Sequence, residues 1–218
     1  MESITLSELL PEVFSSPDHN PTLRDSEIWI REVTFDRGCR TQITAASGTG
    51  KSSLLAYIYG RRSDYLGNIY FDGKDTRTLS IADWCDLRCR TLAMLPQEPE
   101  LFPELTALEN VDIKNRLTDF RQQKWIADAF EALGIADRMN FPAGKMSVGQ
   151  QQRVAIIRTL CQPFDFLLLD EPVSHLDADA NAAVATLVEQ TASQLGAGVI
   201  ATSVGNHLKL CFTTRLSL

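Results

Sequence analysis

Short runs of apolar residues recur along the chain, and stretches with helical spacing separate them. Four of these runs have the length of a buried strand, and they span residues 41–45, 91–95, 166–169 and 199–202. A strand that is buried on both faces carries continuous rather than alternating apolar residues. The four runs therefore predict an α/β core built on a mostly parallel sheet.

The N-terminal part of the chain has a different pattern. Residues 1–26 are weakly patterned, and the polar, proline-containing residues 15–21 predict a loop. Residues 28–35 and 68–71 alternate and are rich in strand-forming types, and the second stretch runs into an Asp-Gly turn. These features predict an antiparallel edge sheet near the start of the chain.

The residues between the second and third core strands predict a helical lobe. Apolar residues in 120–134 have helical spacing and Gly134 is a natural stop, while residues 108–117 add to the same lobe. Asp177 is expected to cap a further helix. The inner face of that helix would carry Ala180, Val184, Leu187 and Val188.

A chain of 218 residues is long enough for one substantial domain. We therefore expect a single domain over residues 1–218. Its P-loop core, with the antiparallel β-subdomain, would occupy about residues 27–97 and 160–218. The helical lobe would occupy about residues 98–159, and residues 1–26 would form a weakly patterned N-terminal segment.

The composition is that of a water-soluble globular protein, with 44% apolar and 22% charged residues. No apolar run reaches the roughly 18 residues that cross a bilayer, and the start lacks a signal peptide, so we expect a cytosolic protein. The net charge of −7 argues against non-specific binding to nucleic acid or anionic lipid. The five scattered cysteines favour reduced thiols, because Cys85 and Cys89 have no second Cys or His pair nearby to complete a zinc site.

The strongest motif is Ala-Ala-Ser-Gly-Thr-Gly-Lys-Ser at residues 45–52, between a predicted strand and a predicted helix. This is the context of a P-loop, in which glycines let successive N–H groups point at the phosphates of a nucleotide. Lys51 would add a mobile cation, and the Ser52 hydroxyl would bind Mg²⁺. Ala45 replaces the first glycine, which the backbone tolerates where φ is negative. The expected nucleotide-binding residues here are Ser47, Gly48, Thr49, Gly50, Lys51, Ser52 and Ser53.

The apolar run at residues 166–169 ends in two adjacent acids, Asp170 and Glu171. In open α/β sheets, ligands collect at the carboxyl ends of strands. There Asp170 would hold Mg²⁺, and Glu171 would face the attacking water. The alternative is a solvated turn before Pro172. Two adjacent acids repel each other unless a cation or a proton relieves that repulsion. The P-loop upstream favours the metal site over the solvated turn.

Residues 146–153, Met-Ser-Val-Gly-Gln-Gln-Gln-Arg, open a further helix. Taken alone, Ser147 is an N-cap and Gln150 completes a capping box, which needs no ligand. The order of motifs is more specific, because this helix start follows the P-loop and immediately precedes the acidic strand. In that order the chain resembles the ATP-binding cassette (ABC) ATPase family, whose signature reads Leu-Ser-Gly-Gly-Gln. The resemblance extends from about residue 27 to the C-terminus.

The resemblance implies roles for further residues. Gln97 matches the Q-loop, where the family contacts metal, water and the transmembrane partner. Residues 174–177 match the D-loop at the dimer interface. Ser147, Gly149 and Gln150 match the signature, which meets the γ-phosphate bound by the opposite subunit. Altogether, the resemblance implies metal ligation by Ser52, Gln97 and Asp170, and catalytic positions at Glu171, Gln97 and Ser203.

The switch position departs from the family pattern. Ser203 stands where the family usually carries a histidine that contacts the γ-phosphate and organises the attacking water. Losing one such preorganised donor costs roughly 10²–10³ in rate. His207 lies four residues further on. It either substitutes for the missing histidine or is an ordinary surface residue.

Two further departures concern the nucleotide. The family stacks adenine on an aromatic residue upstream of the P-loop, but residues 15–26 contain no Phe, Tyr or Trp. Phe14, His19 and Trp29 are the remaining candidates. Val148 replaces a signature glycine, and its β-branched side chain would crowd the nucleotide.

The resemblance implies a subunit that binds Mg-ATP, works in a dimer of cassettes and drives a separate permease from the cytoplasmic face of the membrane. Residues 101–111 look most similar to importers and to lipoprotein-release or macrolide-export cassettes. One alternative is a degenerate cassette that binds ATP in a regulatory or scaffolding role with little hydrolysis, which Ser203 favours. Another is an ABC-type ATPase acting on DNA or ribosomes. The acidic balance and the lack of coiled-coil heptads or a second cassette argue against it, and we expect no nucleic-acid partner.

Overall fold

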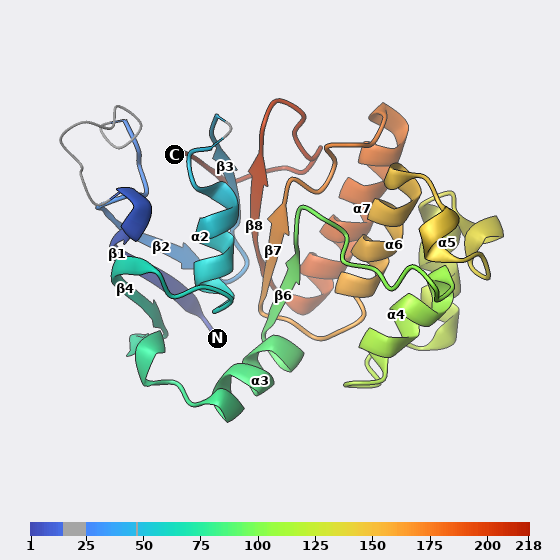
Figure 1. Ribbon diagram of the computed structural model, residues 1–218, viewed down its shortest axis with the longest axis horizontal. Coiled ribbons are helices and arrows are strands. Elements are labelled where there is room, and N and C mark those ends of the chain that lie inside the picture. Colours follow the sequence, from blue (N-terminus) through green and yellow to red (C-terminus); the bar gives the residue numbers. More distant parts are fainter. Residues whose placement is uncertain (15–24, 47) are drawn as a thin grey trace.

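A five-stranded parallel sheet forms the centre of the computed structural model, which describes residues 1–14, 25–46 and 48–218 (Figure 1). The strands follow the order β6-β7-β8-β3-β9, and every neighbouring pair is parallel. Each predicted core strand overlaps an observed one, so the α/β class with a mostly parallel sheet is confirmed. The strands are β3 (Arg40–Thr44), β6 (Leu92–Leu95), β7 (Phe166–Asp170), β8 (Gly198–Ser203) and β9 (Thr214–Ser217).

Both faces of the central strands β7 and β8 are buried, which explains their continuous apolar runs. Phe166 and Leu168 of β7 pack in a cluster with helix α2 (Lys51–Ile58), whereas Leu167 and Leu169 pack in a second cluster with the helices of the other face. Those helices are α6 (Val148–Thr159) and α7 (Ala178–Leu195). Because side chains alternate along a strand, Asp170 shares the α2 side of the sheet with Phe166 and Leu168.

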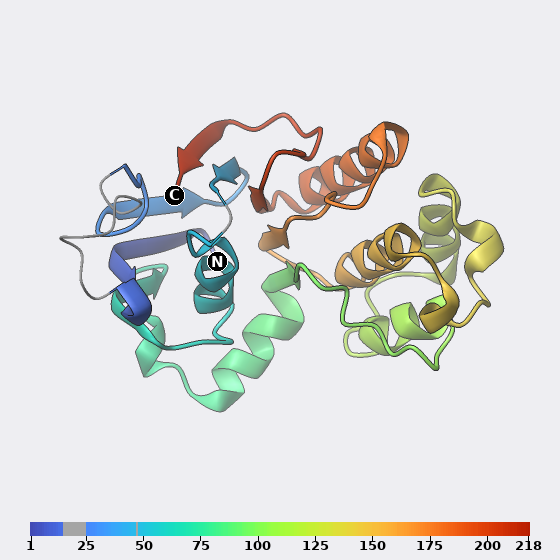
Figure 2. The ribbon, with the colours of Figure 1, turned by 45° about the horizontal axis from the view of Figure 1, so that its top comes forward.

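A four-stranded antiparallel sheet, ordered β2-β1-β4-β5, lies beside the core (Figures 1 and 2). Its strands are β1 (Ser3–Pro11), β2 (Glu32–Asp36), β4 (Tyr65–Phe71) and β5 (Lys74–Asp75). The sheet predicted near the start is present, but strand β1 was not predicted. Glu8 has a positive φ of 49° and the pairing with β4 shifts register between Ser7 and Leu10, so the alternation of buried residues breaks. The loop predicted over residues 15–21 lies outside the described residues.

The helical lobe lies at the opposite end of the molecule from the antiparallel sheet (Figure 2). It contains α4 (Ala107–Asn115) and α5 (Gln123–Ala132), which pack with α6. Asp177 caps α7 as predicted, because its side chain accepts a hydrogen bond from the N–H of Ala180 at 2.8 Å. Helix α3 (Ile81–Arg90) was not predicted, and none of its residues is buried.

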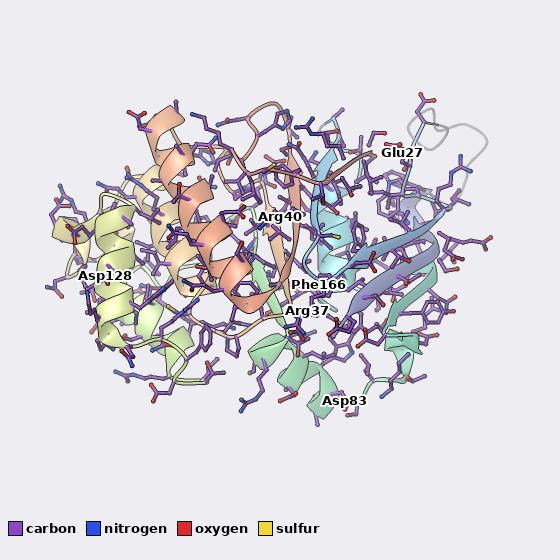
Figure 3. The ribbon with its side chains drawn as sticks, turned by 180° about the vertical axis from the view of Figure 1, so that it is seen from behind. Glu27, Arg37, Arg40, Asp83, Asp128 and Phe166 are labelled. Carbon is purple, nitrogen blue, oxygen red and sulfur yellow. The ribbon has the colours of Figure 1, made fainter. Side chains whose placement is uncertain are left out.

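Ion pairs tie the antiparallel sheet to the amino end of β7. The N-terminal ammonium lies 2.6 Å from Asp165, and Nη2 of Arg37 lies 3.1 Å from the same carboxylate. Figure 3 shows Arg37 beside Phe166 at this lower edge of the sheet, while Asp83 and Asp128 lie on separate outer helices. The carboxyl ends of the core strands meet at the opposite edge, which carries the P-loop, Gln97, the Asp170–Glu171 pair and Ser203.

Candidate functional site

The P-loop joins β3 to α2 at the carboxyl edge of the parallel sheet. Gly48 and Gly50 have positive φ values of 83° and 98°, which other residues rarely adopt. A Cβ at Gly50 would also lie 2.9 Å from Cζ2 of Trp29. Ala45 does not have a positive φ, so the alanine at the start of the motif causes no strain of that kind. Ser47 lies outside the described residues.

Lys51 is buried against this loop, with its side chain only 5% exposed. Its Nζ donates to the carbonyl oxygens of Ala46 at 2.8 Å and Ala45 at 3.4 Å, and it lies 3.9 Å from Oε1 of Glu171. The Thr49 hydroxyl also donates to the carbonyl of Ala46, at 2.9 Å, and so stiffens the turn. A buried ammonium held mainly by neutral carbonyl groups is well placed to pair with an anion.

The first turn of α2 adds backbone donors at the same place. The N–H groups of Lys51, Ser52 and Ser53 have no acceptor within the helix. Gly50 precedes them without a side-chain cap. A helix start of this kind, beside a buried lysine, presents the N–H donors and positive charge that suit phosphate groups.

Asp170 and Glu171 end strand β7 next to the loop. Asp170 is 2% exposed, and its Oδ1 accepts a hydrogen bond from the Thr202 hydroxyl at 2.7 Å. Glu171 has a positive φ of 49°, and its N–H lies 3.3 Å from both the carbonyl oxygen and the hydroxyl of Thr202. This sharp exit from the strand leaves the Glu171 carboxylate beside Lys51.

Two neighbouring cavities connect these groups. One, of about 390 Å³, is lined by P-loop residues with Gln97 and Glu171. The other, of about 350 Å³, is lined by all three expected metal ligands, Ser52, Gln97 and Asp170. A hydroxyl, an amide oxygen and a carboxylate are hard oxygen ligands of the kind that Mg²⁺ prefers, so these residues fit the metal.

The structure separates the three candidates for stacking on adenine. Phe14 is half-buried and lines the larger cavity together with Val13, which is 79% exposed. Trp29 instead lies in the core below the P-loop, and its Nε1–H donates to the carbonyl of Thr49 at 3.2 Å. His19 is outside the described residues.

The signature residues stand apart from these cavities within the chain. Ser147 caps α6, because its Oγ accepts from the N–H of Gln150 at 3.3 Å while Gln150 Oε1 accepts from the N–H of Ser147 at 3.0 Å. Val148 is 52% exposed. A Cβ at Gly149 would lie 3.0 Å from the carbonyl of His175, so the helix start packs tightly on residues 174–177.

The segment that carries Gln97 is anchored further along by Glu100. Both carboxylate oxygens of Glu100 accept from Arg61 at 2.8 Å, and this pairing raises the pKa of Arg61. Arg158 donates to the carbonyl oxygens of Glu100 and Pro99 at 2.9 and 3.1 Å. Gln97 itself is exposed and lines both cavities.

Ser203 ends β8 and is 4% exposed. Its register partner on β3 is Thr44, immediately before the P-loop. The Ser203 hydroxyl lies 2.7 Å from Nδ1 of His207 and 3.5 Å from Nε2 of Gln42, and it lines neither cavity. The hydroxyl at the switch position is therefore engaged by His207, an exposed residue.

The sequence analysis missed two residues, Arg61 and Gln152, whose side chains hold the backbone or the segment that carries a site residue. Arg61 anchors the Gln97 segment, and no local pattern predicts its pairing with Glu100. Gln152 on α6 donates to the carbonyl of Glu171 at 3.1 Å. A signal was present for Gln152, because this polar residue shares the buried helix face of Ile156 and Thr159 at i, i+4 and i+7.

A family model described as ABC transporter matches residues 31–174. The chain belongs to the ABC transporter family. The match spans the P-loop, Gln97, the signature and the Asp170–Glu171 pair. The chain is thus an ATP-binding cassette, the ATP-binding subunit of an ABC transporter.

Relatives of this cassette belong to transporters with different named roles. The lipoprotein-releasing system ATP-binding protein LolD of Syntrophotalea carbinolica is 34% identical over 162 residues, which cover 73% of this chain and 71% of that protein. The sulfate/thiosulfate import ATP-binding protein CysA of Anthoceros angustus is 34% identical over 177 residues, which cover 80% of this chain and 44% of that protein. A dimeric structure of MJ0796, a bacterial ABC transporter cassette, has the same fold, with a TM-score of 0.75 at 24% identity over 92% of this chain and 87% of that one.

In the part of the chain that the structure describes, no helix combines the length and apolarity needed to cross a membrane.

Proposed function

We propose that this cassette hydrolyses Mg-ATP at the site between the P-loop and the end of β7. The 3.9 Å separation between Nζ of Lys51 and Oε1 of Glu171 supports this most directly. It brings a cation suited to phosphate groups next to a carboxylate that can accept a proton from water, in one cavity with the first turn of α2.

In the proposed reaction, the loop amides and Lys51 hold the β- and γ-phosphates. The oxygen of a water molecule forms a bond to the γ-phosphorus while the bond from that phosphorus to the bridging oxygen of ADP breaks, and Glu171 accepts the proton of the water. Mg²⁺, held by Ser52, Gln97 and Asp170, would neutralise charge on the phosphate oxygens. Phe14 would support the adenine ring by stacking.

The proposed working unit is a dimer of cassettes. The P-loop covers the phosphates from one side, and the capped start of α6, with Ser147, Gly149 and Gln150, does not line either cavity. The N–H groups at the α6 N-terminus of a second cassette can therefore bind the γ-phosphate from the other side. ATP then joins the two cassettes, and loss of the γ-phosphate releases them.

The dimer is proposed to drive a separate integral membrane permease. LolD and CysA are named as ATP-binding proteins of a releasing system and an importer, which supports such a partner without assigning a cargo. We propose that the subunit binds this permease at the cytoplasmic face of the membrane without inserting into the bilayer.

The test is phosphate release by the purified chain with Mg-ATP, combined with light scattering to follow dimerisation. We expect phosphate release that depends on Mg²⁺ and increases more than linearly with protein concentration. ATP binding without any release, even with the permease present, would reject hydrolysis.

The engaged hydroxyl of Ser203 favours a second candidate. A serine cannot carry positive charge, and here its hydroxyl is bound to His207 and does not line the cavity. Turnover would then be slow, and a cassette with very slow turnover would serve a regulatory or scaffolding role.

Replacing Ser203 with histidine is expected to raise kcat. The new imidazole supplies the preorganised donor that this position lacks, and the gain is bounded by the roughly 10²–10³ that one such donor contributes. Phosphate release at saturating Mg-ATP measures it, and Ser193→His on the exposed surface of α7 is the control. No gain in the Ser203 variant would mean that another step limits the rate.

A further inference from the structure

Gln152 occupies a position that a structural role alone does not explain. It is 3% exposed in the middle of α6, and its Nε2 donates to the carbonyl oxygen of Glu171 at 3.1 Å. Its Oε1 is buried without a partner in the described part of the chain. A buried amide with one unmet acceptor is less favourable than an apolar side chain of the same size, unless the bond that it does make is needed.

The residue that Gln152 contacts has an unfavourable backbone. Glu171 has a φ of 49°, in the left-handed region that residues with a Cβ rarely adopt. Such a conformation persists only where the surroundings hold it. Thr202 holds the N–H of Glu171 from β8, and Gln152 and the N–H of Ser174, at 3.3 Å, hold its carbonyl group.

The backbone of Glu171 determines where its carboxylate points. A change from positive to negative φ would rotate the Cα–Cβ bond and move the carboxylate away from its place 3.9 Å from Lys51. The amide of Gln152 opposes that change, because it fixes the carbonyl side of the residue from a second element of the fold.

We propose that Gln152 is a positioning residue for Glu171, and that it makes the placement of this base depend on the position of α6. The proposal rests on the proposed function, in which Glu171 accepts the proton of the attacking water. Ser147 and Gly149 lie at the start of the same helix, so an anion bound at that end and the base at β7 share one rigid element. A cassette whose α6 N-terminus binds an anion would thus keep the carboxylate of its own Glu171 beside Lys51.

Gln151 provides a matched control on the same helix. It is the same residue type and partly buried, but its Nε2 donates to the carbonyl oxygens of Ala143 and Met146 at 3.0 and 3.2 Å, inside the helical lobe. Gln151→Met and Gln152→Met each remove one amide and keep an unbranched side chain of similar length. They differ in which carbonyl group loses its donor.

The experiment compares kcat, KM and melting temperature for the wild type and the two variants in the presence of Mg-ATP. Gln152→Met is expected to lower kcat by about 10- to 100-fold, since a small misplacement of a reacting group costs up to about 10² in rate. Its KM should stay within about twofold of the wild-type value, and its ATP-dependent melting shift should stay within about 1 °C of the wild-type shift. The variant should still dimerise with ATP. Gln151→Met should keep the wild-type kcat.

The outcomes separate this proposal from the proposed function. A wild type that binds ATP without hydrolysing it rejects Glu171 as the base, and the role of Gln152 with it. A wild type that hydrolyses ATP while Gln152→Met does so equally fast overturns the positioning role alone. An equal loss of kcat in Gln151→Met, or a loss that follows weaker ATP binding or a lower melting temperature without nucleotide, would also overturn it.

Discussion

Replacing Lys51 with alanine is expected to abolish the stabilisation that Mg-ATP gives the cassette. A protein that binds one ligand present at a hundredfold excess over Kd gains about 2.7 kcal/mol in free energy of unfolding. For a domain of this size, each 1 kcal/mol raises the melting temperature by roughly 2–4 °C. The wild type should therefore melt several degrees higher with Mg-ATP, and the variant should show almost no shift.

The reason lies in the position of the ammonium group. Lys51 is the buried cation of the P-loop, and its Nζ contacts the loop carbonyl groups and lies near Glu171. Without it, the phosphates would meet the loop amides and a nearby carboxylate with no positive side chain between them. Lys124→Ala is the control, since this lysine is exposed on α5 and pairs with Asp128 at 2.9 Å. A full melting shift in Lys51→Ala would show that the nucleotide binds elsewhere.

Replacing Glu171 with glutamine is expected to reduce phosphate release by about 10²–10⁴, the contribution typical of a general base. Glutamine keeps the size of the side chain but cannot accept the proton of water. ATP should bind as tightly as in the wild type, because the P-loop, Lys51 and Asp170 are unchanged. The ATP-bound dimer should then accumulate.

Two measurements check this prediction. Phosphate release gives the rate, and light scattering in Mg-ATP should show a doubled molar mass for Glu171→Gln. Glu104→Gln, at an exposed position between the Gln97 segment and α4, should behave as the wild type does. A variant that binds ATP but stays monomeric would argue against the dimer, and one that hydrolyses ATP normally would remove Glu171 from the reaction.

The core of the fold could be predicted because each buried strand carries its signal locally. The run from Phe166 to Leu169 is apolar on both faces of the sheet, and its short length between polar flanking residues favours a buried strand over a helix. Strand β1 alternates only over residues 3–7, a short signal that was missed, because the bulge at Glu8 then makes Leu9 and Leu10 buried in succession. Helix α3 has no fully buried residue, and only the folded chain shows that its partly buried Trp84 and Leu87 pack against the core.

The candidate site likewise has parts that the sequence predicts and parts that only the folded chain shows. The P-loop, the acidic pair and the capped start of α6 are contiguous segments whose chemistry depends on neighbouring residues, and the sequence shows them. The contacts of Arg61 with Glu100 and of Gln152 with Glu171 join separate elements, and only the folded chain shows which groups meet. The bond between Ser203 and His207 spans four residues, yet its existence depends on the turn after β8.

The terminal phosphates are the part of the nucleotide that the proposed site recognises, and calorimetry with Mg-ATP, Mg-ADP and AMP tests this directly. We predict measurable heat with Mg-ATP and Mg-ADP, and binding of AMP at least about 100-fold weaker. Losing two charge-assisted hydrogen bonds of roughly 1.5 kcal/mol each accounts for two factors of ten. The absence of heat with Mg-ATP, or binding of AMP as tight as that of ATP, would contradict a phosphate site formed by Gly48, Gly50 and Lys51.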